Sequence, residues 1–261
     1  MSILDLIVWM IFASLATWIG IKKYLKYFWT SKGVSYVAGP PLVGVISNVL
    51  LNKTSFSQLF LDLYNHPKTK KDAVTGFYFF HKACLLVRHP ELFKRILVKD
   101  FNQFPDRRMS SDPKSDPIGM NTLVNVKGDT WRNIRNHITP VFTETDEFLR
   151  TAILDVMQER EKKTLRLYPS IPFLERTCQP ADGKASYSLE PYHKFSIPRG
   201  MPIYIPAIAV QRDPNFFPDP LTFSPERFAP DAEPRIDHNL LFGLRTGSKE
   251  LPRIPFWNIT S

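Results

Sequence analysis

The sequence predicts a helix-rich α+β domain behind an N-terminal membrane helix, and three observations lead to this fold class. Residues 3–21 form one apolar run, several later segments repeat apolar residues at helical spacing, and others are short β-type runs. The 261 residues are 43% hydrophobic and 23% charged, which is ordinary for a globular protein. A chain of this length holds one large domain or two small ones.

The first element is the apolar run 3–21, whose only charged residue is Asp5. As a helix it would be about 28 Å long, close to the hydrocarbon thickness of a bilayer. A cleaved signal peptide needs basic residues before the apolar run, and a buried core helix is the other alternative. Basic residues only follow the run, so we expect a single-pass helix with the body of the protein in the cytosol. These residues are Lys22, Lys23, Lys26 and Lys32.

The segment after the run should lie at the membrane surface. Aromatic side chains are common at that depth, and here they are Tyr24, Tyr27, Phe28 and Trp29. Pro40 and Pro41 then form a stop that separates the anchor from the domain. We therefore expect a membrane anchor with its basic flank over 1–32 and the main domain over 33–261.

The first half of the body contains a helix, a hairpin and a second helix. Residues 75–80 and 84–90, joined by His81-Lys82, predict a β-hairpin. Pro90 is a first-turn proline for the helix that follows it. The earlier helix, over 55–66, ends before Pro67 and places four apolar residues on one face: Phe56, Leu59, Phe60 and Leu63.

The second half is predicted from weaker patterns. Asp129 is a good N-cap for a helix over 130–138, and another helical pattern covers about 145–167. Residues 195–198 and 201–210 predict two strands around a turn. A proline-rich irregular stretch then runs to residue 230.

Charge and cysteine content exclude several classes of function. The net charge is +9, but Lys and Arg are spread over the whole chain, which favours an anionic membrane or an acidic partner over nucleic acid. Cys84 and Cys178 lack CxxC spacing, so neither a zinc site nor a disulfide scaffold is indicated. We expect both cysteines to be small core residues in a protein from a reducing compartment.

Two arginines and a tryptophan are the first candidate site residues. Trp131 and Arg135 share one helix face at i and i+4. Their donors suit the carboxylates of a ligand, while a cation–π pair on a surface helix is the alternative that the spacing alone favours. Arg166 lies between two leucines, so it should be partly buried and need a carboxylate.

Several longer stretches, taken together, resemble the microsomal cytochrome P-450 family, the haem-thiolate monooxygenases. The insect enzymes that oxidise lipophilic xenobiotics are the nearest branch, and the similarity covers about 36–142 and 152–228. The stretches are "ILVKDFNQFPDR", "WRNIRNHITPVFT", "TLRLYPSIPFLERTC", "IPRGMPIYIPAIAVQRDPNFFPDP" and "FSPERF".

The resemblance implies a role for each matching residue. Trp131, Arg135 and Arg176 match residues that bind the haem propionates. Arg166 matches the arginine of the ExxR helix, and Arg227 matches the arginine of the PERF segment, so Arg227 should pack toward Arg166.

The ExxR glutamate is missing, because Lys163 occupies its position and Glu159 lies about 10 Å farther along the helix. We therefore expect Lys163→Glu to stabilise the network of Arg166 and Arg227.

The chain also departs from the family in two longer regions. The central block that includes the oxygen-activating helix is missing after about 143. The haem-ligand loop begins to match at Phe242 and Gly243 and then diverges, so that Lys249 stands at the cysteine position. An iron thiolate needs a cysteine sulfur, so we assign no catalytic residue and no metal ligand.

The resemblance implies haem-dependent oxidation of lipophilic small molecules at the endoplasmic reticulum membrane, with electrons from an NADPH-dependent reductase. We expect this chain to be inactive as written, as a truncated, misjoined or alternatively spliced product with a partial cytochrome P-450 fold. The alternative is a non-catalytic, membrane-anchored binding protein. A nucleic-acid role is a distant third, since no basic stripe with interleaved aromatics is present.

Overall fold

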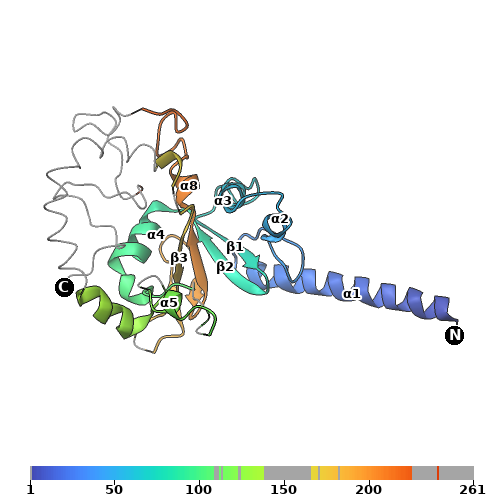
Figure 1. The fold of residues 1–261 in the computed structure, drawn as a ribbon. Helices are drawn as coiled ribbons and strands as arrows, with labels where there is room; N and C mark the ends of the chain where they lie inside the picture. The colour runs from blue at the N-terminus through green and yellow to red at the C-terminus, as the bar shows by residue number, and fades with distance from the viewer. Residues whose placement is uncertain are drawn as a thin grey trace.

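The computed structural model describes residues 2–108, 112, 114–122, 125–137, 166–169, 171–181, 183–224 and 240. Within these ranges helices and a small sheet form a body from which one long helix projects (Figure 1). That helix, α1 (Ile3–Thr30), starts with a capping box in which Ser2 and Asp5 exchange side-chain to main-chain hydrogen bonds. Asp5, the only charged residue of the apolar run, therefore caps the N-terminus of the helix.

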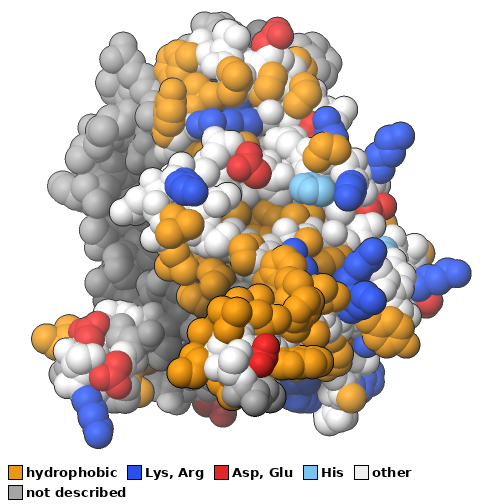
Figure 2. All heavy atoms as spheres, turned by 90° about the vertical axis from the view of Figure 1, so that its right-hand side faces the viewer, with side chains coloured by type: hydrophobic (Ala, Val, Ile, Leu, Met, Phe, Trp, Pro, Cys, Tyr) orange, Lys and Arg blue, Asp and Glu red, His pale blue; other side chains and the backbone are white. Residues whose placement is uncertain are grey.

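The exposed part of α1 has the length and composition of a membrane-crossing helix, and none of its most apolar stretch is buried. The alternative of a buried core helix is therefore wrong for that stretch. Figure 2 looks at the molecule from the side to which α1 points, and hydrophobic side chains gather there beside several basic ones.

The four-stranded sheet has the order β1-β2-β6-β3. The predicted hairpin is present as β1 (Val74–Phe79) and β2 (Lys82–Val87), which pair antiparallel. Strand β6 (Pro202–Ile205) runs parallel to β2, and β3 (Leu174–Thr177) pairs antiparallel with β6. Phe79 pairs with Lys82, so the turn is Phe80-His81, one residue earlier than expected. Phe80 adopts the positive φ of 50° that tight hairpin turns require.

The end of α1 corrects the predicted boundary between anchor and domain. Trp29 was expected at the membrane surface, yet it is 0% exposed and lies against β1, where a Cβ on Gly76 would be 2.2 Å from its ring. The segment with Pro40 and Pro41 does not separate the two parts, because its neighbours hydrogen-bond along β1, as Val37 N–H does to Gly76. Burying a large indole in the protein core gives a larger favourable free energy than placing it at the membrane surface.

The two strands predicted around residue 200 belong to different sheets. Strand β5 (Ser196–Pro198) pairs with β4 (Ser186–Ser188), whereas β6 joins the larger sheet. The strand expected to reach residue 210 ends at Ile205, and the short helix α8 (Ala207–Val210) follows. Pro206 lies between them and has no N–H to continue the ladder.

The helices of the first half match their predictions closely. Helix α3 (Phe56–Tyr64) is capped by Ser55, and three of the four predicted apolar residues are buried, while Phe56 is 42% exposed. Helix α4 (Pro90–Lys94) begins at Pro90 as predicted and continues into the π-helical turn η1 (Arg95–Lys99). The other short helices are α2 (Ser47–Leu50), η2 (Phe101–Gln103) and α5 (Pro117–Met120).

The first candidate site residues lie on a helix that begins at residue 128 and is described as far as residue 137. Asp129 is therefore inside its first turn and not its cap, and it pairs with Arg132 at 3.1 Å. The N–H of Gly128 donates instead to the Asp106 carboxylate, at 3.2 Å. In the predicted helix 145–167 only residues 166 and 167 are described, and both are helical.

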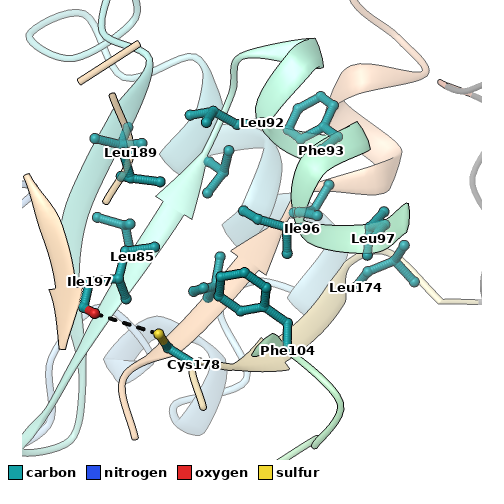
Figure 3. Packing of buried hydrophobic residues seen from close by; sticks show 14 of the residues in the cluster. Leu85, Leu92, Phe93, Ile96, Leu97, Phe104, Leu174, Cys178, Leu189 and Ile197 are labelled. Carbon is teal, nitrogen blue, oxygen red and sulfur yellow. Dashed lines mark hydrogen bonds between the residues drawn. The ribbon is translucent and has the colours of Figure 1, made fainter. Parts of the chain in front are cut away.

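The sheet separates two apolar clusters because successive strand residues point to opposite faces. Leu85 and Ile203 belong to the larger cluster, and Leu86 and Tyr204 to the smaller one. Figure 3 shows the larger cluster, where α4 and η1 cover the sheet with Leu92, Phe93, Ile96 and Leu97.

Candidate functional site

The candidate site lies where β3, η2 and helix 128–137 meet. Arg176 on β3 places its guanidinium carbon 5.9 Å from the ring centroid of Phe101. The ring of Trp131 lies 6.0 Å from the same Phe101 ring. Arg135, one turn after Trp131, is buried as well. The fold thus gathers Trp131 and Arg176 around one phenylalanine, and the surface cation–π alternative for Trp131 and Arg135 is wrong because both are buried.

Main-chain contacts hold these segments together. The N–H of Thr177 on β3 donates to the Asp106 carbonyl at 2.8 Å, while the carboxylate of Asp106 accepts from Gly128. The N–H of Gln179 donates to the Gln103 carbonyl at 2.7 Å. Asp106 therefore fixes the start of helix 128–137 against the strand that carries Arg176.

A third arginine, Arg107, belongs to the same cluster and was given no role by the sequence. Burial lowers the pKa of Arg107, and the nearby charge of Arg135 lowers it further. Burial also lowers the pKa of Arg176, and the charge of Arg107 adds to that effect. Arg107 is the last residue of the stretch "ILVKDFNQFPDR", which resembles the family. Its place in that stretch is the sequence feature that could have indicated a role.

Arg176 is 3% exposed, and its Nη1 donates to the Glu175 carbonyl at 2.8 Å. Its Nε is buried and has no hydrogen-bond partner among the residues that the structure describes. A buried donor on a cation is costly when it is unpaired. The cluster therefore favours a ligand that brings negative charge and acceptor oxygens.

The carboxylate of Glu175 lies on the other face of the sheet from the Arg176 side chain. Glu175 pairs with Tyr204 across the sheet, whereas Arg176 pairs with Ile203, so the two side chains point to opposite faces. Burial raises the pKa of Glu175, while Arg108 and the Tyr204 hydroxyl lower it. Glu175 offsets the charges of Arg107 and Arg176 only through space.

Arg166 is buried as predicted, and its described partners are main-chain carbonyls. Its Nη1 donates to Gln211 at 2.8 Å and to Pro220 at 2.7 Å, and its Nη2 donates to Thr222 at 3.3 Å. Arg166 thus contacts the chain just before the PERF segment. Arg227 and Lys163 lie outside the described residues, so their packing toward Arg166 stays a prediction.

Both cysteines are buried, as expected of core residues. The Sγ of Cys178 donates to the Ile197 carbonyl at 3.5 Å (Figure 3), and that of Cys84 donates to the Lys82 carbonyl at 3.5 Å. Burial raises the pKa of each thiol to about 12. Neither thiol suits an iron ligand, which must be a thiolate.

The arginine cluster therefore has the positive charge and N–H donors that the carboxylates of a haem would need. The two thiols are protonated and buried, so they do not have the chemistry that its iron would need. In the described part of the chain no group of three or more His, Cys, Asp or Glu side chains is placed to hold a metal ion. The chemistry of the donors indicates recognition of an anionic group.

A further buried arginine, Arg88, was missed by the sequence and has a structural role. Its Nε donates to Tyr64 at 3.1 Å, and its Nη2 donates to Leu63 at 2.6 Å and to Thr69 at 3.1 Å. Its Nη1 donates to the Thr75 hydroxyl. Arg88 thus caps the C-terminus of α3 and joins it to β1, because a cation stabilises helix C-terminal carbonyls.

These features define a mixed helix and sheet protein with a cluster of arginines at the meeting point of β3, η2 and helix 128–137. The family model of cytochrome P450 matches residues 37–163 and 162–244, and the chain belongs to that family. The predicted family is therefore confirmed. The family is one of haem monooxygenases, and it implies a haem cofactor, a reductase partner and lipophilic substrates.

Curated relatives are insect cytochromes P450. Probable cytochrome P450 6g2 of Drosophila melanogaster is 34% identical over 142 residues, which are 54% of this chain and 27% of that protein. Cytochrome P450 6l1 of Blattella germanica is 36% identical over 166 residues, 64% of this chain and 31% of that protein. Probable cytochrome P450 6t3 of Drosophila melanogaster is 30% identical over 185 residues, 67% of this chain and 36% of that protein. The matched regions span about a third of these relatives.

Proposed function

We propose that this chain is a membrane-anchored cytochrome P450 relative that retains the haem-propionate side of the site and performs no thiolate-dependent oxidation. The observation that carries the proposal is the buried cluster of Arg176, Arg135 and Trp131, in which the Nε of Arg176 has no partner in the part of the chain that the structure describes. Haem, when bound in this family, supplies an iron that activates dioxygen.

The residues of this chain would bind and orient the cofactor. Arg176 and Arg135 would bind the propionates through charge-assisted hydrogen bonds, and Arg107 would add positive charge to the same region. Trp131 would contribute its indole N–H as a donor. Phe101, which both Trp131 and Arg176 contact, would keep water from the donors.

The second half of the proposal concerns the iron ligand. The sequence has two cysteines, and each holds its proton in the core with a pKa raised to about 12. Lys249 stands at the position of the family cysteine, and an ammonium group cannot donate a lone pair to iron. Oxidation of lipophilic compounds with reductase-supplied electrons would then not occur in this chain.

We also propose that α1 anchors the protein in the endoplasmic reticulum membrane as a single pass, with the body in the cytosol. The support is the exposed apolar stretch of α1 followed by lysines. Washing membranes with alkaline carbonate should leave the protein in the pellet, and release into the supernatant would contradict the anchor.

A second candidate is a non-catalytic, membrane-anchored protein that binds no haem and engages lipid or an acidic partner. The +9 net charge favours it. Haem incorporation separates the two candidates.

The test is a spectrum of the full chain produced with added haem, reduced and treated with carbon monoxide. We expect a haem absorbance band that Arg176→Met weakens, without the red-shifted band of a thiolate-ligated iron. The red-shifted band would overturn the proposed loss of activity, and the complete absence of haem would favour the second candidate.

A further inference from the structure

We infer that the body of the protein makes a second contact with the membrane, through a patch of exposed apolar side chains at the β1–β2 turn and α2, and that Trp29 fixes this patch relative to α1. The members of this apolar patch are Leu42, Leu50, Leu51 and Phe80. Its occupant is the headgroup layer and outer acyl chains of the leaflet that α1 enters. This contact rests on the proposed anchoring by α1 and goes beyond it, because a separate segment of the chain enters the same leaflet.

The direction of β1 brings the hairpin turn toward the membrane. The ring of Trp29, near the end of α1, lies against Gly76. Farther along the strand, the Tyr78 hydroxyl donates to the Leu25 carbonyl at 3.3 Å, one turn earlier on the helix. The strand therefore runs opposite to α1, back toward the apolar run. Phe80 follows at the turn, and Figure 1 shows this end of the hairpin beside α1.

Leu42 and Phe80 lie on two loops that a main-chain hydrogen bond joins. The Phe80 N–H donates to the Val43 carbonyl at 2.9 Å. Leu42 and Phe80 have positive φ values of 70° and 50°, a conformation that bulky residues rarely adopt, and both side chains are exposed. Strained residues of this kind concentrate at functional surfaces, and a membrane would bury both side chains.

Helix α2 and its C-cap supply the other two members of the apolar patch. Ile46 and Val49 pack against the smaller apolar cluster, so the inner side of this segment already has its apolar contacts. Leu50 and Leu51 are exposed on the outer side, where a surface helix normally has polar residues. Figure 1 shows α2 on the side of the body from which α1 projects, so the exposed leucines and the hairpin turn belong to one surface.

Basic side chains accompany the apolar patch, as a leaflet with anionic headgroups favours. Lys82 follows the hairpin turn, Lys53 follows α2, and both are exposed. On α1, the Nζ of Lys22 lies 3.8 Å from the ring centroid of Trp18, an arrangement that suits the boundary between acyl chains and headgroups. Figure 2 shows hydrophobic and basic side chains together on this side of the molecule.

The contact has a fixed geometry because α1 is continuous with the body. The helix runs without a break over Ile3–Thr30, and Trp29 in its last turn is fully buried. Its ring lies 6.2 Å from that of Tyr78 and 5.9 Å from that of Phe195. Swivelling the body about the end of α1 would expose this indole to water. The apolar patch therefore lies at one depth whenever α1 spans the membrane.

The experiment measures the depth of one residue in a bilayer. The full chain with Leu42→Cys is labelled with an environment-sensitive fluorophore and reconstituted into vesicles of phosphatidylcholine and phosphatidylserine. Cys84 and Cys178 are buried, so the label goes to the introduced thiol. Lipids that carry a spin label at the headgroup or deep in the acyl chain quench the fluorophore according to its depth. We expect the label within about 5–10 Å of the boundary between headgroups and acyl chains, the depth of interfacial apolar side chains.

Matched variants assign the effect to the apolar patch. Ile118→Cys is the control for labelling, because Ile118 is also apolar and exposed but lies on α5, which Figure 1 shows on the side of the sheet away from α1. In the Leu42→Cys chain, Phe80→Asn makes the turn polar with a residue that accepts positive φ. It should lower the quenching to the level of the Ile118 label, whereas Phe80→Leu should leave the quenching unchanged.

The outcomes distinguish this contact from the anchor. A Leu42 label quenched no more than the Ile118 label, in a protein that stays in the pellet after alkaline carbonate washing, would overturn the second contact and leave the anchoring by α1 intact. Equal quenching in the Phe80→Asn and Phe80→Leu chains would overturn the role of the apolar patch. Release of the protein by carbonate would overturn the anchor, and the second contact with it.

Discussion

Arg88 and Arg176 are both buried arginines, 6% and 3% exposed, yet their surroundings differ in kind. The guanidinium of Arg88 donates to two carbonyls at the end of α3 and to two threonine hydroxyls. That of Arg176 donates to one carbonyl, has no partner for its Nε among the residues that the structure describes, and lies near a second arginine. The described residues supply acceptors for every nitrogen of the first guanidinium, whereas they leave one nitrogen of the second without an acceptor, which we propose a ligand supplies.

The difference shows how a structural cation can be distinguished from a binding one. Burial lowers the pKa of both arginines, so burial alone does not separate them. The number of hydrogen-bond acceptors near each guanidinium separates them. A buried cation whose donors all have acceptors stabilises the fold, whereas a buried cation with an unpaired donor destabilises it. Substitution by methionine, which is similar in length and uncharged, tests this contrast directly.

Arg88→Met should produce the largest effect. It leaves the Leu63 and Tyr64 carbonyls and two hydroxyls without a donor in the core. The expected loss in free energy of unfolding is about 3–5 kcal/mol, measured by urea denaturation of the full chain in detergent. A loss below about 1 kcal/mol would mean that water replaces the guanidinium.

Arg176→Met should act in the opposite direction. Removing the Arg176 cation relieves its repulsion with Arg107, so the free energy of unfolding of the ligand-free chain should rise by about 1–3 kcal/mol. Haem binding, as proposed above, should weaken in the same variant. A destabilised Arg176→Met protein would show that Arg176 holds the fold as Arg88 does.

Lys163→Glu extends the contrast to Arg166, whose described donors reach three carbonyls. A carboxylate at the ExxR position should add a charge-assisted acceptor and raise the free energy of unfolding by about 1 kcal/mol. The matched control is Lys163→Gln, which removes the lysine charge without supplying a carboxylate. Equal midpoints for both variants would exclude a contact with Arg166 or Arg227.

The smallest effect at neutral pH concerns the two thiols. Burial raises the pKa of Cys84 and Cys178 to about 12 from an ordinary value of 9.0. Both thiols therefore stay protonated in the folded chain, and their contribution to stability is present below pH 9 and lost as the pH rises toward 12.

A thiol reagent at pH 8 should label neither cysteine until urea unfolds the chain. Rapid labelling of the folded protein would show that one thiol is accessible and ionised. Cys84→Ser and Cys178→Ser, each alone, identify the residue that reacts.

The sequence predicted the elements whose signals are local. The apolar run, the proline at the start of α4 and the β-type runs of the hairpin β1–β2 each depend on a few neighbouring residues. The candidate site residues Trp131, Arg135 and Arg176 were proposed from motifs, and Arg107 was missed because the charges near it in the fold are distant in sequence.

Tertiary structure decided the features that depend on long-range contacts. The aromatic residue Trp29 fits a membrane interface by composition, yet Gly76, far along the chain, leaves a space that its indole fills. Asp129 has the residue type of an N-cap, yet Asp106 accepts the bond from Gly128. Whether a buried arginine is satisfied, like Arg88, or incomplete, like Arg176, depends on which carbonyls the fold brings within about 3 Å of it. Residue type and spacing determine the donors, and only the folded chain determines their acceptors.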